Sequence, residues 1–349
     1  MKRGILVIIL AVTVIEIQAC RYTIREIGYS NLLLEDYQLT LEADSAKHKE
    51  LIHDFLSLAF AHSVDANFHY NYIQTKITSP NLSFLSGKKK QLFSQTVKST
   101  NDIINSLDYC LYSPSQKELA EKINRSFAVI LYFEEKSGAK KEILNTIAKA
   151  VKEFKNVAPY LDRAVSEDIP VIQIPFEKRI SNEIILKTLD AKNDHTGKMV
   201  AIIFGKGRLA GDPLVNEKLT SDNILNKLLL LGTDCECGID LSPILERALP
   251  LHWSKELRQE TAEMLGFDSD NPMVLAEMST ILQKGSSRDE SSASLFMPDM
   301  FFLKQKTVEK SEIKSNDPYS KTLSMTVITL ISIILIVISS TVLIFYRKR

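Results

Sequence analysis

Two kinds of hydrophobic pattern follow one another from residue 37 onward. The segment Tyr37–Ala43 alternates between apolar and polar residues, which is typical of a strand with one buried face. Apolar residues then recur at the spacing of one helical face, so we expect a helix over residues 46–62. Asp44 and Ser45 stand just before this helix and are expected to cap its N-terminus.

Shorter alternating stretches come next, separated by turn residues. Residues 67–73 alternate again and predict a second strand. An apolar stretch at 82–85, followed by Gly87 and three lysines, predicts a hairpin into residues 91–93. A helix over residues 99–107 follows. The predicted order is therefore strand, helix, strand, and then two strands and a helix.

A second stretch of the chain repeats this order more clearly. Residues 127–133 form a continuous apolar run of strand length, which favours a fully buried strand. Ile143, Ile147 and Phe154 then fall on one face of a helix. Val171–Ile174 lies between two prolines and is expected to be a short strand.

The second stretch continues with another helix and a hairpin. Ser181 is expected to cap a helix over residues 182–189. Met199–Phe204 reads as a strand, and a glycine-rich turn at 205–207 allows residues 208–213 to return as its hairpin partner.

Three more helices are expected after this hairpin. The first is capped by Thr220 or Ser221 and stops at Gly232. Beyond it the character of the chain changes, and helices are expected over Lys255–Leu265 and over residues 268–283.

The element order of both stretches resembles the thioredoxin fold. A thioredoxin-type enzyme carries Cys-x-x-Cys at the start of its first helix, where the helix N-terminus stabilises the thiolate. The corresponding positions here, residues 44–47 and 136–140, contain no cysteine. Pro80 takes the place of the proline that usually precedes the third strand and is a candidate for a cis bond, whereas residues 196–198 lack that proline. The resemblance therefore implies the shape of thioredoxin without its catalytic residues.

A second resemblance covers most of the mature chain. Residues 20–28 and 232–238, together with 265–268 and 271–274, resemble a family of uncharacterised exported bacterial proteins. That family brings no activity that could be transferred to this chain.

The N-terminus has the pattern of a secretory signal peptide. Lys2 and Arg3 precede a short apolar run at 4–15, and the small residue Ala19 stands before Cys20. The run is short for a membrane span, which needs about 20 residues, although a signal anchor stays an alternative. Cleavage near Ala19 is expected, and lipidation of Cys20 is left open.

The C-terminus predicts a membrane anchor. Residues 323–346 contain no charged residue, are rich in Leu, Ile and Val, and are long enough to cross the bilayer, and the basic residues 347–349 follow them. A flexible linker is expected at 285–322: residues 285–294 are serine-rich and charged, residues 295–303 are an apolar interruption, and the remainder is polar. We therefore expect a single-pass protein with an extracytoplasmic, periplasmic N-terminal part and another envelope protein as its partner.

The charge balance excludes one class of partner. The chain has 43 basic and 43 acidic residues, so it lacks the excess of positive charge that nucleic-acid binding requires.

The cysteines are the candidate chemistry. Cys20, Cys110, Cys235 and Cys237 would all lie outside the cytoplasm, where thiols tend to pair. Structural disulfides are the first interpretation, and a redox-active pair of Cys235 and Cys237 is the second. A metal site with those two residues and His252 is a weak third candidate, because Cys-x-Cys spacing with one distant histidine is not a typical zinc pattern.

Three glycines after a strand are explained without a cofactor. Gly205, Gly207 and Gly211 do not have the spacing of a dinucleotide-binding loop, and no helix follows them directly. A hairpin turn that needs positive φ accounts for them, so no cofactor is expected.

The sequence thus predicts an α/β protein with two tandem thioredoxin-like modules and a small helical tail that carries cysteines. No catalytic residue is assigned, and the expected function is that of a membrane-anchored binding or adaptor protein. The alternative is a thiol-disulfide oxidoreductase or metal-binding protein that uses Cys235 and Cys237. The expected boundaries are 1–19 for the signal peptide, 20–125 and 126–233 for the modules, 234–284 for the tail, 285–322 for the linker, 323–346 for the transmembrane helix and 347–349 for the cytoplasmic end.

Overall fold

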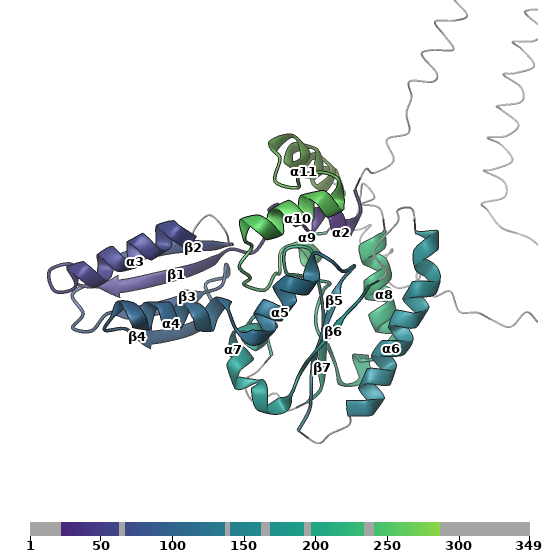
Figure 1. The fold of residues 1–349 in the computed structure, drawn as a ribbon, viewed down its shortest axis with the longest axis horizontal. Coiled ribbons are helices and arrows are strands. Elements are labelled where there is room, and N and C mark those ends of the chain that lie inside the picture. The colour runs from purple at the N-terminus through teal and green to yellow at the C-terminus, as the bar shows by residue number, and fades with distance from the viewer. Residues whose placement is uncertain are drawn as a thin grey trace, which may run out of the picture. The chain divides into compact units, whose positions relative to one another are not determined.

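Two β-sheets with helices packed on them make up the described part of the chain (Figure 1). The structure is a computed structural model. It describes residues 22–62, 67–136, 140–161, 168–191, 197–233 and 241–286. The mixed α/β class that the sequence predicts is confirmed.

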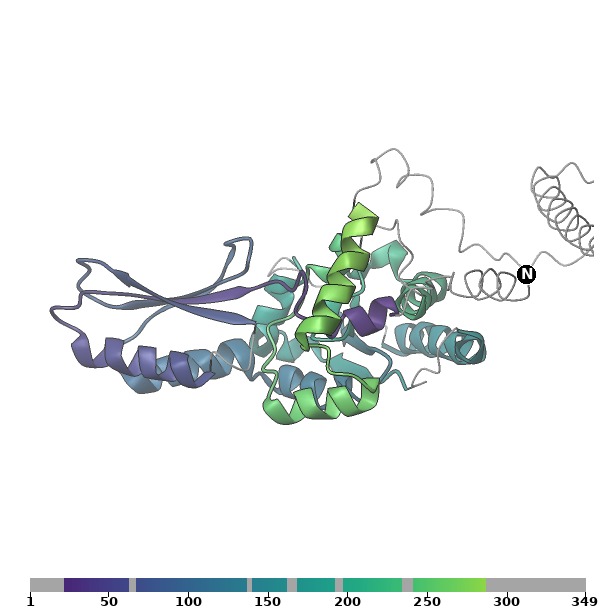
Figure 2. The same ribbon diagram turned by 90° about the horizontal axis from the view of Figure 1, so that it is seen from above.

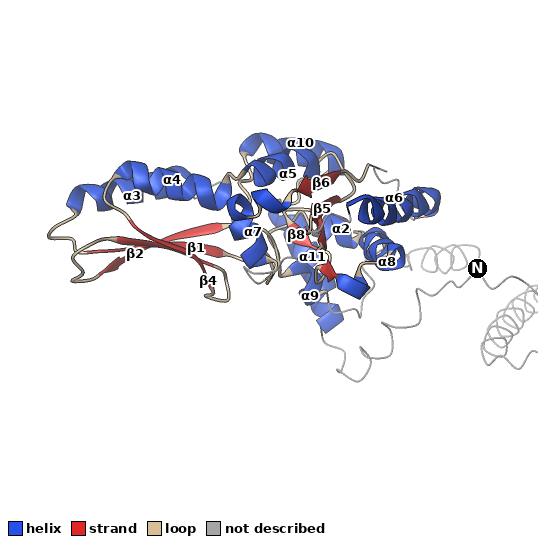
Figure 3. Cartoon of the chain, turned by 90° about the horizontal axis from the view of Figure 1, so that it is seen from below, coloured by secondary structure: helices blue, strands red, loops and turns tan. Residues whose placement is uncertain are grey.

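The first sheet has four strands in the order β2-β1-β3-β4. The central strand β1 pairs in parallel with β2 and antiparallel with β3, and β3 pairs antiparallel with β4. Helices α3 and α4 lie on the same face of this sheet (Figures 2 and 3). The bounds are Tyr37–Ala43 for β1, Lys49–His62 for α3, Phe68–Gln74 for β2, Asn81–Leu85 for β3, Gln91–Thr96 for β4 and Thr100–Leu111 for α4.

The alternation in β1 decides which face of the first sheet is covered. Tyr37, Leu39 and Leu41 belong to a core that also contains Phe55 of α3 and Ile103 of α4. The residues between them along the strand are mostly polar and face the opposite side, which the described helices leave uncovered (Figure 2). Such alternation is typical of a sheet with one face packed on a core, although Thr40 on the other face is itself only 3% exposed.

The second sheet has the same strand order, β6-β5-β7-β8, and β9 also pairs with β7. Strand β5 is parallel to β6 and antiparallel to β7, as β1 is to β2 and β3. The strands are β5 Val129–Phe133, β6 Val171–Ile174, β7 Met199–Phe204, β8 Arg208–Leu209 and β9 Leu214–Val215. The helices are α5 Pro114–Ile123, α6 Lys140–Val157, α7 Glu183–Thr188 and α8 Ser221–Gly232, with 3-10 turns at Ala158–Tyr160, Phe176–Lys178, Ile180–Asn182 and Asn216–Lys218.

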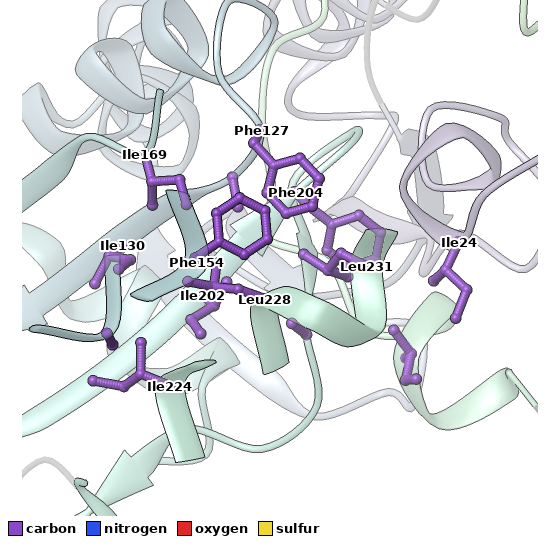
Figure 4. Close-up of a cluster of buried hydrophobic side chains, with 14 of the residues drawn as sticks. Ile24, Phe127, Ile130, Phe154, Ile169, Ile202, Phe204, Ile224, Leu228 and Leu231 are labelled. Carbon is purple, nitrogen blue, oxygen red and sulfur yellow. The ribbon is translucent and has the colours of Figure 1, made fainter. Parts of the chain in front are cut away.

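Both faces of the second sheet are buried, because β5 and β7 are apolar at every position. One face packs against α6 and α8, where Phe154 and Leu228 meet Ile130 and Ile202 of the strands (Figure 4). The other face packs against α5 and α7 in a second cluster that includes Leu131.

The segment before the first sheet and the segment after α8 contribute residues to the clusters on the two faces of the second sheet. Ile24 and Leu245 belong to the cluster of α6 and α8, and Leu251 and Trp253 belong to the cluster of α5 and α7. The helices concerned are α2 Ile24–Ile27, α9 Ser242–Leu245, α10 Lys255–Leu265 and α11 Pro272–Ser286.

Two predicted helix starts are wrong. Helix α3 begins at Lys49, because residues 44–48 form a turn in which the Asp44 side chain accepts the N–H of Ala46. Ser181 caps no helix. Its hydroxyl donates to the carbonyl of Lys178, and a 3-10 turn precedes α7 there.

Helix α5 is not predicted from the sequence, although its N-terminus carries a recognisable signal. Ser113 accepts the N–H of Gln116, whose side chain accepts the N–H of Ser113, and Pro114 occupies the first turn. This reciprocal capping arrangement is a typical helix start.

Several expectations lie outside the described residues. These are the signal peptide at 1–19, Cys20, Cys235, Cys237, the linker from residue 287 on, the transmembrane helix at 323–346 and the tail at 347–349. Within the described ranges, none of the helices combines the length and the apolar character needed to cross a membrane. The expected localisation and domain boundaries remain predictions.

Candidate functional site

A cavity of about 280 Å³ lies where the entry to the first sheet meets the β7–β8 turn of the second, and we call it the junction cavity. Its wall includes Leu34 before β1 and Asn67 before β2. From the second sheet and the segments packed on it come Lys206, Leu251 and Trp253. The cavity is therefore built by segments that are far apart in the sequence.

The turn that carries Lys206 requires glycine. Gly205 and Gly207 have φ of 53° and 81°, which confirms the predicted hairpin turn with positive φ. A Cβ at Gly205 would lie 2.3 Å from the carbonyl oxygen of Gly28, so the N-terminal segment crosses directly over this turn. The N–H of Lys206 donates to that same carbonyl over 3.0 Å. The main chain on both sides of Lys206 is thus fixed.

The Lys206 ammonium is buried beside one carboxylate. It is only 7% exposed, and its Nζ donates over 2.8 Å to Oδ1 of Asn31 and to both carboxylate oxygens of Asp270. Burial lowers the pKa of Lys206, the Asp270 carboxylate raises it, and the charges of Arg208 and Arg258 lower it further. The three N–H groups of Lys206 thus have three acceptors, and its charge is paired with that of Asp270.

Arg208 supplies a second buried cation behind Lys206. Its side chain is fully buried, and its guanidinium donates to the carbonyls of Gly28, Ser30, Leu32 and Leu245. Burial lowers the pKa of Arg208 to about 9, so the group is still cationic at neutral pH.

Apolar side chains form the rest of the base. Leu251 and Trp253 are 3% and 6% exposed, and the Trp253 ring lies 6.3 Å from the ring of Tyr29. Trp253 is the only tryptophan of the chain. Its Nε1 donates no hydrogen bond to any of the described residues.

The rim is polar and open. Asp36 and His69 are both largely exposed, and their side chains approach to 3.3 Å. The side-chain amide of Asn67 donates to the carbonyl of Glu35 over 2.8 Å, which ties the start of β2 to the segment before β1.

The structure places two of the residues that the sequence singled out, and it does not bring them together into a reactive site. Cys110 is a free thiol in the core of the first sheet, 1% exposed, and burial raises its pKa well above the usual value. His252 lies with its ring 5.4 Å from that of Tyr112. Cys20, Cys235 and Cys237 lie outside the described residues, and the described side chains include no group arranged to hold a metal ion.

In a thioredoxin enzyme the reactive groups lie after the first strand and before the third strand. The structure shows different contacts at these positions. In the second sheet, Nη2 of Arg179 donates to the carbonyl of Glu134 at the end of β5 and to that of Gly197 before β7. The guanidinium also lies 5.9 Å from the ring centre of Phe133. In the first sheet, the bond before Pro80 is trans, since all peptide bonds between described residues are trans.

Sequence reasoning missed the residues of the junction cavity. The glycines around Lys206 correctly marked a turn, but nothing in their spacing shows which segment crosses over it. Trp253 and Arg208 carried no motif. The available signal was compositional, namely a single tryptophan and a lysine between two turn glycines.

No family model matches the chain, and no curated protein matches it. Two of the solved structures that resemble it are as follows. "Crystal structure of ERdj5 form II" has 10% identity and a TM-score of 0.20 over 60% of this chain and 28% of that chain. "Human ERp44 zinc-bound form" has 11% identity and a TM-score of 0.20 over 69% of this chain and 64% of that chain.

The chain thus spans less than two thirds of either structure that it resembles. At this TM-score neither likeness carries an argument about fold or activity. The structure itself shows a mixed α/β chain with two sheets.

Proposed function

We propose that the chain is a non-catalytic binding or adaptor protein with two tandem thioredoxin-like modules, held at the extracytoplasmic side of a membrane. The single observation that supports binding is the junction cavity, which the entry to the first sheet and the β7–β8 turn of the second build together. Ligand pockets occur preferentially at such junctions between structural units.

The interior of the cavity is organised before any ligand arrives. The side chain of Lys206 is fixed by Asn31 and Asp270, and its main chain is fixed by the contact with Gly28. Ordering these groups in advance reduces the entropy that binding must overcome. This is the property expected of a recognition site.

A thiol-disulfide oxidoreductase is the rival function, and Cys235 and Cys237 would carry it. Among the described residues, the thiol of Cys110 does not favour that activity. Burial raises its pKa, so little of it is the thiolate that attacks disulfides.

The test compares full-length chains in their native membranes, by cross-linking, purification and mass spectrometry. Leu34→Trp places a bulky side chain in the wall of the cavity, whereas Leu56→Trp changes a leucine on α3 that is 48% exposed. We expect Leu34→Trp to reduce recovery of the partner at least tenfold, and Leu56→Trp to leave it unchanged.

Equal recovery with both variants would show that the cavity is not the binding site. A second measurement addresses the rival function. If the purified chain reduces a disulfide substrate and the double variant Cys235→Ser, Cys237→Ser loses that activity, the protein is an enzyme and the adaptor proposal is wrong.

A further inference from the structure

The first sheet has two edge strands, and they differ in how they are protected. In the order β2-β1-β3-β4 the edges are β2 and β4 (Figure 1). At β4, the ammonium of Lys187 donates to the carbonyl of Leu92 over 2.6 Å, and the register with β3 shifts at this residue. A lysine at the edge and an irregular register both keep an edge strand from pairing with another chain.

Strand β2 has neither of these protections. It covers seven residues, Phe68–Gln74, and contains no proline, lysine, arginine or carboxylate. Its register with β1 runs without a shift from end to end. A regular, uncharged edge strand of this length is a ready template for an added strand.

The pairing with β1 fixes which main-chain groups of β2 face outward. The N–H of Tyr37 donates to the carbonyl of Asn67, and the N–H of Thr75 donates to that of Ala43. Successive residues of a strand direct these groups to opposite sides, so the odd-numbered residues of β2 bond to β1. The outward N–H and C=O groups belong to Phe68, Tyr70, Tyr72 and Gln74. No described residue hydrogen-bonds these outward groups.

A second copy of β2 fits the open edge when it runs antiparallel about a twofold axis at Asn71. Each outward residue then lies opposite an outward residue, with Phe68 opposite Gln74 and Tyr70 opposite Tyr72 of the second copy. Each such pair exchanges two main-chain hydrogen bonds. The two copies of Asn71 face each other on the axis as a pair without mutual main-chain bonds, the arrangement in which side chains lie closest.

The side chains of β2 also suit a copy of the same strand. An amide both donates and accepts, so Asn71 can pair with itself. Tyr70, whose ring lies 5.9 Å from that of Phe55 on α3, meets Tyr72 of the second copy, and aromatic pairs across strands are favourable. On the opposite face, Ile73 is 40% exposed and meets His69 of the second copy.

We propose that the chain forms a twofold dimer in which two copies of β2 pair antiparallel about Asn71 and join the two first sheets into one continuous sheet. The occupant of the edge is a second copy because the strand complements itself in hydrogen bonding and in side chains, and because no Asp, Glu, Lys or Arg of β2 brings like charges together. This inference goes beyond the proposed function, since it uses the main chain of β2 and not the junction cavity.

Charge placed on the twofold axis tests the pairing. The full-length chain is studied in detergent and reducing buffer, and analytical ultracentrifugation measures the dissociation constant of the dimer. Asn71→Lys and Asn71→Glu each place two like charges opposite one another, so each should raise this constant at least fivefold. A mixture of the two variants places opposite charges there and should dimerise at least as well as the unmodified chain.

Ser94→Lys is the matched control. Ser94 is exposed and lies in the same cross-strand row as Asn71, but on β4 at the opposite edge. It should change the dissociation constant less than twofold. The proposal is wrong if the unmodified chain is a monomer at every concentration, if Asn71→Lys and Ser94→Lys act alike, or if the mixture does not restore pairing.

Hydrogen exchange of the unmodified chain gives a measurement that depends on no variant. When the dimer is diluted until it dissociates, the N–H groups of Tyr70 and Tyr72 should lose protection, because only the second copy binds them. Those of His69 and Asn71 should keep their protection, because they bond to β1. Loss at all four positions or at none contradicts the proposal. Protection of Tyr70 and Tyr72 by a different bound protein would show an extended partner strand in place of a second copy, which also overturns it.

Discussion

The single side chain of Arg208 connects three parts of the chain. Its guanidinium donates over 2.9 Å to Gly28 and over 2.7 Å to Ser30, and it also binds the carbonyls of Leu32 and Leu245. These groups belong to the N-terminal segment and to α9, so the hairpin residue holds both against the second sheet. The sequence shows only a basic residue in a predicted hairpin.

Replacing this guanidinium is expected to be costly. Arg208→Met keeps the length and apolar stem but leaves several buried carbonyls without a donor, and each such group costs roughly 1–3 kcal/mol. We expect the free energy of unfolding, measured by urea denaturation of the purified chain, to fall by about 3–5 kcal/mol.

Arg247→Met is the matched control for this variant. Arg247 pairs with Asp190 and Asp212, whose side chains are 66% and 90% exposed. Exposed pairs contribute about 0–1 kcal/mol, so the loss should be small. Similar losses in the two variants would contradict the structural role given to Arg208.

The start of α4 shows how a local signal acts at the scale of an element. Ser99 accepts the N–H of Asp102, and the Asp102 carboxylate accepts the N–H groups of Lys98 and Ser99. These hydrogen bonds lower the pKa of Asp102, with that from Lys98 contributing most. The ionised carboxylate is therefore the form that supports the helix.

A pH dependence follows from this lowered pKa. The contribution of the Asp102 carboxylate to stability is fully present above the usual carboxyl pKa, near 3.8. It is lost as the pH falls through the lowered pKa that Asp102 has in the folded chain. We expect the denaturant midpoint of the unmodified chain to fall between pH 5 and about pH 2.5, in part because Asp102 becomes protonated. In Asp102→Asn that part of the fall should be missing, because the variant has no carboxylate at this position. Ser99→Ala should lower stability by about 1 kcal/mol.

Asp108→Asn, near the other end of the same helix, serves as the control for acid sensitivity. It should keep the acid-dependent loss of the unmodified chain, because the capping carboxylate is still present. An NMR titration of the Asp102 carboxyl checks the direction of the pKa itself, and a value above the usual range would refute the capping argument.

In the described part of the molecule as a whole, helix α7 connects the two sheets. Ile184 belongs to the core of the first sheet, whereas Ile185 and Leu186 belong to that of the second. Lys187 of the same helix donates to the carbonyl of Leu92 in β4 over 2.6 Å. The Tyr109 hydroxyl on α4 donates to Glu183 over 2.7 Å, so elements of both sheets contact this one short helix.

We therefore expect the two sheets to unfold together. Ile184→Ala should lower the free energy of unfolding by about 2–4 kcal/mol, the range for a large-to-small change in a core. Hydrogen exchange should show the same decrease of protection in β1 and in β5, although Ile184 packs only into the first core. Ile180→Ala changes a side chain that is 81% exposed and should alter stability by less than about 0.5 kcal/mol.

Loss of protection in β1 alone would mean that the sheets unfold independently. It would also agree with the expected module boundary near residue 125.

The sequence predicted the strands well, because their signal is local. Tyr37–Ala43 and Val171–Ile174 have the predicted bounds, since alternation in one case and flanking prolines in the other are properties of neighbouring residues. The start of α10 and its end at Gly266 were also predicted correctly, because they too depend on neighbouring residues. Gly266 ends the helix with a φ of 75°. The start of α3 was predicted wrongly, because the Asp44 side chain accepts a hydrogen bond within a turn instead of capping the helix.

The junction cavity could not be predicted, because it is made by long-range contacts. Lys206 and Asp270 are 64 residues apart, and Arg208 and Gly28 are 180 residues apart. No periodicity connects such positions. Candidate chemistry drawn from motifs pointed to cysteines, whereas the described structure gathers a lysine, an arginine and a tryptophan.

The sequence by itself thus determined the order and type of most elements, through propensity, alternation and turn residues that act between near neighbours. Only the tertiary structure decided that the N-terminal segment crosses the turn at Gly205, that Arg208 is fully buried, and that α7 is shared by two cores. The physical reason is that burial and charge pairing depend on which distant segments meet. That choice is made by the packing of the whole chain.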